Sequence, residues 1–303
     1  MFDLISIGNI SIDLFFLGDS LTFKENRFQL AVGGKYFSTY FHESVGGGGA
    51  NVAIGAGLNG LHAAVLGKIG NNPFKKIITD RFKKENVSYD MSEVEENYYN
   101  ISAVLLTPKG ERTIVHYTSP HQHILEGKKT LVNLRKSSTV YFGNLPDVSI
   151  GERERIMRFL KKNNILTVVN LGISDCRRSK EQLEGFLKYV DILIINGHEF
   201  SELVKAPYKD IHFSDNVIDW YIPHLSTKLV IITEGAKGSF GYFNGKVLHQ
   251  IAVKVEKIVD TTGTGDGYTA AFIAEYHKSK NLSKAMDRGA KYAARILYKV
   301  GAN

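Results

Sequence analysis

Short apolar runs alternate with amphipathic segments along most of the chain. The runs at 191–195 (DILII) and 229–233 (LVIIT) are mostly apolar, which is typical of strands buried on both faces. In 72–86, apolar side chains recur every three or four positions and share one helical face. The repeated order of strand and helix predicts an α/β fold with a central, mostly parallel sheet and crossover helices. The predicted strands are 4–8, 62–67, 101–106, 113–117, 139–142, 166–171, 191–195 and 229–233. The predicted helices are 50–59, 72–86, 152–163, 180–188, one from 198, 265–278 and 283–300.

A segment near the N-terminus breaks this alternation. Residues 10–45 are rich in aromatic and β-branched side chains, such as Phe15 and Phe16, and show no helical periodicity. A hairpin is predicted in 97–118, where Pro108-Lys109-Gly110 marks the turn. We expect the two segments to form a small extra sheet beside the main domain. The alternative for 10–45 is a long surface excursion.

The composition is that of a folded protein. The 303 residues are 43% hydrophobic and 23% charged, which excludes disorder as the main state. No run approaches the roughly 18 apolar residues of a membrane span. The N-terminal MFDLISIGNISIDLFF lacks a basic stretch and indicates two strands, not a signal peptide. The lone cysteine, Cys176, excludes an intrachain disulfide and favours a reducing compartment, so we expect a cytoplasmic protein.

The net charge of +7 is spread along the chain. Such a modest excess suits a phosphate-bearing ligand, whereas nucleic-acid binding requires a concentrated basic stripe. We therefore expect small-molecule partners, no nucleic acid and no membrane.

The strongest local motif is DTTGTGDGYTAAFIAEY, residues 260–276, in which a glycine-rich turn opens into an apolar helix. Gly263, Thr264, Gly265 and Asp266 would present backbone N–H groups at the positive end of that helix, where an anion is favoured. Asp266 either caps the helix or acts as a general base toward a hydroxyl while the amides stabilise developing charge. The second arrangement is complete for phosphoryl transfer from a nucleotide to an alcohol.

A second glycine-rich motif, GGGGANVAIGAGLNG, covers residues 46–60. Its first glycines would bring the backbone against a ligand, and Asn51 offers donors and acceptors for a polyol. The alternative is a flexible turn before a tightly packed helix. Gly55, Gly57 and Gly60 match G-x-G-x-x-G, but the dinucleotide fingerprint requires a preceding strand and a following helix. The order here is reversed, so we interpret these glycines as close helix packing and a helix C-cap.

Two further motifs directly follow predicted strands, where α/β folds place their ligands. Asn196 and Glu199 in INGHEF can hold hydrated magnesium or orient water around phosphates. Their alternative role is an N-cap asparagine with a first-turn glutamate. In TEGAKGS, residues 233–239, the glycines would admit an adenine or ribose edge, and the alternative is a plain β-turn.

Together these motifs resemble the ribokinase-like, or PfkB, family of carbohydrate kinases. DTTGTGD is similar to the family signature D-T-x-G-A-G-D, with Thr264 in place of alanine, and GGGGAN is similar to G-G-x-x-x-N. The resemblance runs from GNISID at 8–13 to the final helix. It implies one kinase domain over 1–303, a three-layer α/β/α fold and a small β-sheet lid formed by about 10–45 and 97–118. In many relatives this lid also forms a homodimer contact.

The resemblance also implies roles for individual residues. Asp266 matches the catalytic base, and the anion hole matches Gly263, Thr264 and Gly265. The acceptor site matches Ser11, Asp13, Gly46, Gly47, Asn51 and Asn144. The nucleotide site matches Asn196, Glu199, Thr233, Gly235 and Gly238. The implied cofactors are Mg²⁺ with ATP, near Glu199 and through water, and K⁺ near Asp260 and Thr262.

The sequence leaves the acceptor open. Gly48 replaces the lysine of the ribokinase GGKGAN, and Asn170-Leu171-Gly172 replaces the frequent N-P-A-P, so the chain departs from the commonest sugar kinases. We predict an ATP-dependent kinase for the hydroxymethyl group of a ribose- or fructose-like sugar. The alternatives are a kinase for a ribonucleoside such as adenosine and a non-catalytic sensor of sugars or nucleotides. The intact glycine-rich turn around Asp266 disfavours the sensor.

Overall fold

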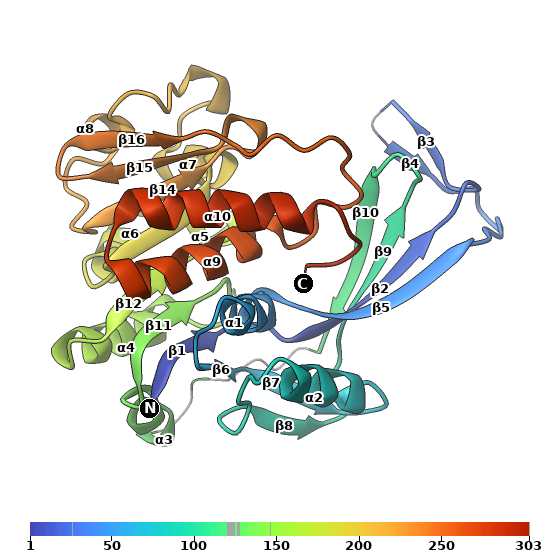
Figure 1. Ribbon diagram of the computed structural model, residues 1–303, viewed down its shortest axis with the longest axis horizontal. Coiled ribbons are helices and arrows are strands. Elements are labelled where there is room, and N and C mark those ends of the chain that lie inside the picture. The colour runs from blue at the N-terminus through green and yellow to red at the C-terminus, as the bar shows by residue number, and fades with distance from the viewer. Residues whose placement is uncertain (26, 120–124, 126–127, 146, 303) are drawn as a thin grey trace.

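The computed structural model describes residues 1–302 except 26, 120–124, 126, 127 and 146. Among these residues, eight strands form one sheet in the order β16-β15-β14-β13-β12-β11-β1-β6 (Figure 1). The strands that pair in parallel are β1 (Phe2–Ile7), β6 (Ala63–Leu66), β11 (Ser137–Phe142), β12 (Leu166–Val169), β13 (Ile192–Asn196) and β14 (Leu229–Thr233). An antiparallel hairpin, β15 (Ser239–Phe243) and β16 (Lys246–Gln250), extends one edge of this sheet. The mostly parallel sheet is thereby confirmed.

Helices cover both faces of the sheet. One face packs against α1 (Gly48–Leu58), α9 (Thr264–Ser279) and α10 (Leu282–Ile296) (Figure 1). The other face packs against α4 (Ile150–Lys162), α6 (Lys180–Leu187) and α7 (Gly197–Val204). In β13, Leu193 and Ile195 join the second core, whereas Ile192 and Ile194 join the first. A strand with a hydrophobic core on each side is apolar at its buried positions, which explains the four successive apolar residues 192–195.

The remaining elements are short or peripheral. They are α2 (Lys75–Lys84), α3 (Lys128–Leu134), α5 (Ile173–Cys176), α8 (Val217–Tyr221), β3 (Thr22–Lys24), β4 (Arg27–Gln29), β7 (Lys68–Asn71) and β8 (Glu93–Glu96). No helix in the described part of the chain combines the length and hydropathy needed to cross a bilayer.

A separate four-stranded sheet stands beside the main body (Figure 1). It has the order β10-β9-β2-β5 and consists of β2 (Ser11–Leu17), β5 (Tyr40–Gly46), β9 (Asn100–Leu106) and β10 (Arg112–Thr118). The extra sheet expected from 10–45 and 97–118 is therefore present. We call the face that carries Asp13 and Phe15 the inner face, and the face that carries Phe16 the outer face.

Several elements differ from the sequence-based expectation. The last helix ends at Ile296, not at 300, because the backbone N–H of Val259 bonds the Leu297 carbonyl (2.8 Å) and the chain turns away. The hairpin β15–β16 was not predicted, and 235–237 forms a 3₁₀ turn that leads into it. Gly55 and Gly57 lie inside α1 and Gly60 follows it with φ of 85°, so these glycines pack and terminate a helix as interpreted from the sequence.

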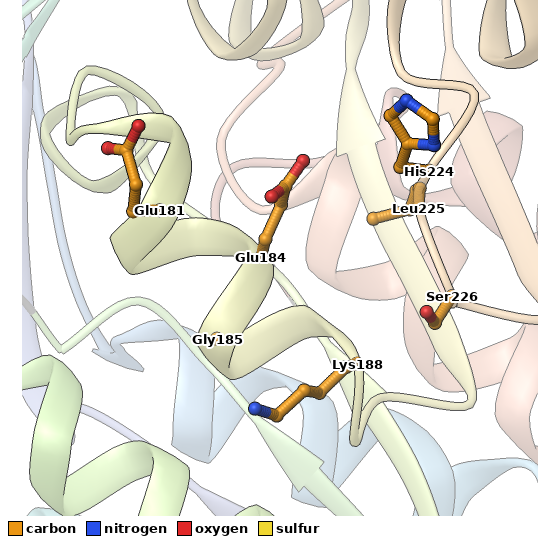
Figure 2. Close-up of a pocket in the computed structure, with 7 residues that line it drawn as sticks. All are labelled: Glu181, Glu184, Gly185, Lys188, His224, Leu225 and Ser226. Carbon is orange, nitrogen blue, oxygen red and sulfur yellow. The ribbon is translucent and has the colours of Figure 1, made fainter.

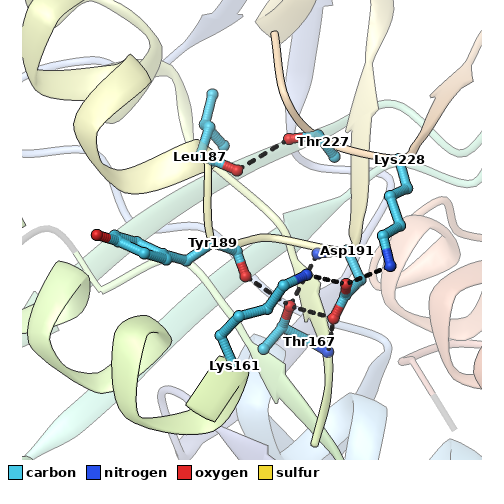
Figure 3. Close-up of polar contacts among 7 residues, drawn as sticks. All are labelled: Lys161, Thr167, Leu187, Tyr189, Asp191, Thr227 and Lys228. Carbon is cyan, nitrogen blue, oxygen red and sulfur yellow. Dashed lines mark hydrogen bonds and ion pairs between the residues drawn. The ribbon is translucent and has the colours of Figure 1, made fainter. Parts of the chain in front are cut away.

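A polar cluster joins neighbouring strands at their amino-terminal ends (Figure 3). The carboxylate of Asp191, just before β13, bonds the Lys161 ammonium (2.7 Å) and accepts from the backbone and hydroxyl of Thr167 (3.1 and 3.0 Å). The Lys228 ammonium lies 3.7 Å from the same carboxylate. This cluster stabilises the edge of the sheet opposite to the carboxyl ends, where the motifs lie.

Candidate active site

Asp266 lies where two helix N-termini meet. The N-cap of α9 is Gly263 (φ 69°), and the Asp266 side chain is not a cap, so the helix-capping alternative is wrong. Its Oδ2 accepts a hydrogen bond from Nδ2 of Asn51 on α1 (2.8 Å). A Cβ added to Gly48, the first residue of α1, would lie 3.5 Å from Asp266 Oδ1. The positive ends of α1 and α9 therefore converge on one carboxylate, which favours anionic groups at this point.

The surroundings of Asp266 adjust its basicity. Burial raises the pKa of Asp266, the hydrogen bond from Asn51 lowers it, and the negative charge of Asp13 raises it further. A carboxylate with a raised pKa is better suited to accept a proton from a hydroxyl near neutral pH.

Asp13 is built into the junction of the small sheet and α1. Its Oδ1 accepts from the Ser11 hydroxyl (3.2 Å), and burial raises its pKa while hydrogen bonds from Ser102 and Ser11 oppose that rise. A Cβ on Gly46 would lie 2.0 Å from Asp13 Oδ2, so only glycine admits this side chain. Gly47 has φ of 87° and caps α1. The structure thus brings Ser11, Asp13, Gly46 and Gly47 next to the first turn of α1, where Asn51 contacts Asp266.

Asn144 is placed differently. It follows β11 and is exposed, and its amide lies against Gly172, whose added Cβ would be 2.4 Å from Asn144 Nδ2. Among the described residues, Asn144 forms no hydrogen bond with Asp13 or Asp266. Its role in the acceptor site stays a prediction.

Asn196 and Glu199 form a reciprocal capping box at the start of α7. Asn196 Oδ1 accepts a hydrogen bond from the backbone N–H of Glu199 (2.9 Å), and Glu199 Oε2 accepts one from the backbone N–H of Asn196 (2.8 Å). Burial raises the pKa of Glu199 to about 7, the Asn196 backbone lowers it, and Asp266 adds to the rise. Burial raises the pKa of Tyr141, which the sequence analysis did not single out, and the negative charges of Asp266 and Glu199 raise it further. Glu199 is therefore both a cap and a member of the same electrostatic centre.

Thr233, Gly235 and Gly238, the predicted nucleotide contacts in TEGAKGS, differ in how closely other atoms surround them. Thr233 ends β14 and pairs with Asn196 of β13, so both lie at the carboxyl edge of the sheet. Gly235 has open space around its α-carbon, whereas Gly238 (φ 93°) would place a Cβ 2.0 Å from the Gln250 carbonyl. Packing and its positive φ therefore require glycine at position 238. The sequence analysis missed Glu234, whose buried carboxylate accepts from the Tyr208 hydroxyl (2.6 Å) and lies against Gly197.

Asp260 is buried and bonded by neutral groups. Its carboxylate accepts from the Thr262 N–H (2.9 Å), the Thr262 hydroxyl (2.7 Å) and the Gly301 N–H (3.0 Å). No lysine or arginine in the described part of the chain forms an ion pair with it. Because an uncompensated buried charge is costly, this carboxylate suits a bound cation.

A surface cleft of about 340 Å³ lies elsewhere, between α6 and the segment that leads into β14 (Figure 2). Its lining includes the side chains of Glu181, Glu184, Lys188 and His224. None of these residues belongs to the motifs, and the cleft plays no part in the site around Asp266.

The model of the pfkB family of carbohydrate kinases matches residues 1–303. The chain belongs to this family. The probable fructokinase-6, chloroplastic, of Arabidopsis thaliana is 26% identical over 262 residues, which are 82% of this chain and 66%, about two thirds, of that protein. A nucleoside kinase of Methanocaldococcus jannaschii is 25% identical over 296 residues, or 96% of this chain and 89% of that protein.

The fold of this pfkB-family kinase is also that of solved relatives. The structure of Arabidopsis thaliana ribokinase complexed with ribose and ATP superposes with a TM-score of 0.79 at 21% identity, covering 99% of this chain and 93% of that one. The ribokinase-like fold and the family inferred from the motifs are confirmed. The protein is therefore an ATP-dependent kinase of a family that includes both sugar kinases and nucleoside kinases.

Proposed function

We propose that this kinase transfers the γ-phosphoryl group of ATP to the hydroxymethyl group of a ribose- or fructose-like sugar. The observation that carries the proposal is the Asp266 carboxylate between the N-termini of α1 and α9, held by Asn51 and coupled to Asp13. Asp266 takes the proton of the attacking hydroxyl. The backbone amides of Gly263, Thr264 and Gly265 stabilise the charge that develops on the phosphoryl oxygens.

The other residues position the two substrates. The Asp13 carboxylate accepts hydrogen bonds from the sugar hydroxyls, and the Ser11 hydroxyl and the Asn51 amide can also donate to them. Gly46 and Gly47 let the backbone approach the sugar. Asn144 stays a predicted neighbour on the same side. Thr233, Gly235 and Gly238 border the nucleotide, because Thr233 ends β14 and the two glycines follow it at the carboxyl edge of the sheet.

Two cations fit side chains of this chain. Carboxylate and water oxygens are the ligands that Mg²⁺ prefers, and Glu199, with Asn196, offers them beside Asp266. Bound magnesium supplies charge neutralisation on the phosphates. The buried Asp260, with Thr262, offers a K⁺ site because its charge has only neutral partners among the described residues.

The single thiol, Cys176, is buried, and we place the protein in the reducing cytoplasm.

A coupled ADP-release assay tests the proposal. Purified protein with Mg²⁺ and ATP is given a panel of pentoses, hexoses, ketoses and ribonucleosides, in potassium or sodium salt. We expect turnover with a sugar and higher activity in potassium. Turnover only with ribonucleosides would contradict a sugar acceptor and favour a nucleoside acceptor, the class in the name of the M. jannaschii relative. Ligand binding without any turnover would support the sensor instead.

The magnesium requirement is expected to depend on pH through Glu199. Because its pKa is raised to about 7, the carboxylate is largely neutral below that pH and binds a cation less well. The Mg²⁺ concentration for half-maximal activity should therefore rise as the pH falls from about 8 to about 6. The folded protein also holds this proton more tightly than the unfolded chain, so the contribution of Glu199 to stability is lost as the pH rises through about 7.

Magnesium titrations of Glu199→Gln at each pH check this expectation. The variant should need more Mg²⁺ at every pH, and the pH dependence should disappear. Glu202→Gln is the matched control on the same helix, because Arg177 lowers the pKa of Glu202 and no change of protonation occurs near neutrality. A pH dependence that persists in Glu199→Gln would assign it to another group.

We further propose that the outer face of the small sheet forms a homodimer. Phe41, Val115 and Tyr117 are 54%, 65% and 59% exposed, and the Phe16 and Phe41 rings pack 5.4 Å apart on the same face. An exposed apolar face on a sheet of this kind is typical of a contact with a second copy.

The Val115→Asp variant is expected to sediment as a monomer where the wild type sediments as a dimer, since a charge would be buried in the contact. Val132→Asp is the matched control, because Val132 is 61% exposed on α3, outside this sheet. A monomeric wild type at micromolar concentration would contradict the proposed dimer.

A further inference from the structure

A polar row crosses three strands of the small sheet on its inner face. Ser102 of β9 is the Cα partner of Asp13 in β2 and of His116 in β10. The Ser102 hydroxyl lies 3.2 Å from Nδ1 of His116, and its hydrogen bond to Asp13 lowers the pKa of that carboxyl. The row starts at a residue of the acceptor site and ends at an exposed imidazole. Neither Ser102 nor His116 belongs to the motifs recognised in the sequence.

The apolar part of the inner face is already covered. Phe15, Val104 and Leu106 form a buried cluster against which Val300 packs. The neighbouring Gly301 lies next to Ser44, with its added Cβ 3.3 Å from the Ser44 hydroxyl. The C-terminal segment thus lies beside the small sheet (Figure 1). An acceptor at Asp13 therefore meets the polar row and not an aromatic surface.

A second polar side chain of β9 lies on the same face. Asn100 precedes Ser102 by two positions in β9, and alternation along a strand places both side chains on one face. Asn100 is 6% exposed. Burial raises the pKa of the neighbouring Tyr98, and a hydrogen bond with the Asn100 side chain opposes that rise. The inner face of β9 is therefore polar at both Asn100 and Ser102.

We propose that Ser102 and His116 form a specificity subsite that binds the hydroxyl or carbonyl oxygens of the acceptor at the end remote from the phosphorylated hydroxyl. The proposal rests on the proposed function and narrows it to acceptors that carry oxygen groups at both ends, sugars and polyols rather than nucleosides whose base has no carbonyl oxygen, such as adenosine. With Nδ1 directed to Ser102, the second ring nitrogen of His116 remains to bond the acceptor. A site built to hydrogen-bond a substrate oxygen rejects an analogue that lacks it, because its own polar groups would lose their partners.

The variants His116→Leu and Ser102→Ala test the subsite. Each should raise the KM for the preferred sugar by roughly tenfold while kcat stays within about threefold and the KM for ATP is unchanged. Ribonucleoside binding, measured by thermal shift without ATP, should stay the same or improve, because the wall becomes apolar. His116→Gln, which keeps a polar side chain, should recover most of the sugar affinity. His224→Leu, an exposed histidine on another surface, is the matched control and should behave as the wild type.

The outcomes separate this inference from the proposed function. If the wild type phosphorylates no sugar, the proposed acceptor class fails. If it does, and both variants keep the wild-type KM for that sugar while remaining folded, the subsite is wrong and the proposed function stands. A sugar KM that rises equally in His224→Leu would likewise overturn the subsite.

Discussion

Replacement of Asp266 by asparagine is expected to lower kcat by about 10²–10⁴-fold, the usual value of general-base assistance. Asparagine preserves the shape of the side chain, and its carbonyl oxygen can still accept the hydrogen bond that Asn51 donates to Asp266 Oδ2. The melting temperature and the affinity for ATP should therefore change little. What the variant loses is the basic oxygen that takes the proton of the hydroxyl.

Measurement of kcat, ATP affinity and melting temperature on one preparation checks this result. Asp287→Asn is the matched control, because Asp287 lies on α10 in a surface pair with Lys291 and such pairs contribute little to stability. A kcat for Asp266→Asn within a few-fold of the wild type would remove Asp266 from the catalytic role. Loss of activity together with loss of the folded state would leave only a structural role for this carboxylate.

Replacement of Gly263 by alanine is expected to lower kcat by about 10²-fold, the cost of disturbing one oxyanion donor. Gly263 has φ of 69° and caps α9, and an added Cβ would lie 2.1 Å from the Cβ of Ala302. The backbone must shift to relieve that contact, and the amides of Thr264 and Gly265 shift with it. Strain at positive φ and overpacking should together lower the free energy of unfolding by about 2–4 kcal/mol.

Gly245→Ala separates these causes. Gly245 has nearly the same φ, 70°, but nothing within 4 Å of an added Cβ, and it lies in the turn between β15 and β16. In Gly245→Ala, backbone strain alone should lower the free energy of unfolding by about 1–2 kcal/mol, and kcat should not change. Steady-state kinetics and denaturant unfolding of both variants give the comparison. Equal kcat values for the two variants would show that the turn at Gly263 does not shape the anion site.

Local patterns predicted the helices and strands that carry the site. The motif around Asp266 opens a helix and Asn196 caps one, because cap and turn preferences act within a few residues. The apolar run 191–195 predicted a strand buried on both faces for the same local reason. The boundary at Ile296 could not be predicted, because the bond that ends α10 comes from Val259.

The distances that make a site were decided by the tertiary structure. Asn51 and Asp266 are 215 positions apart, and packing of α1 against α9 sets their 2.8 Å contact. The motifs alone did not reveal Ser102 and His116, because their significance arises from strand pairing with Asp13. Residue type determined what chemistry each position offers, since that is a property of the side chain. Which side chains act together depended on burial and register, which only contacts between distant segments fix.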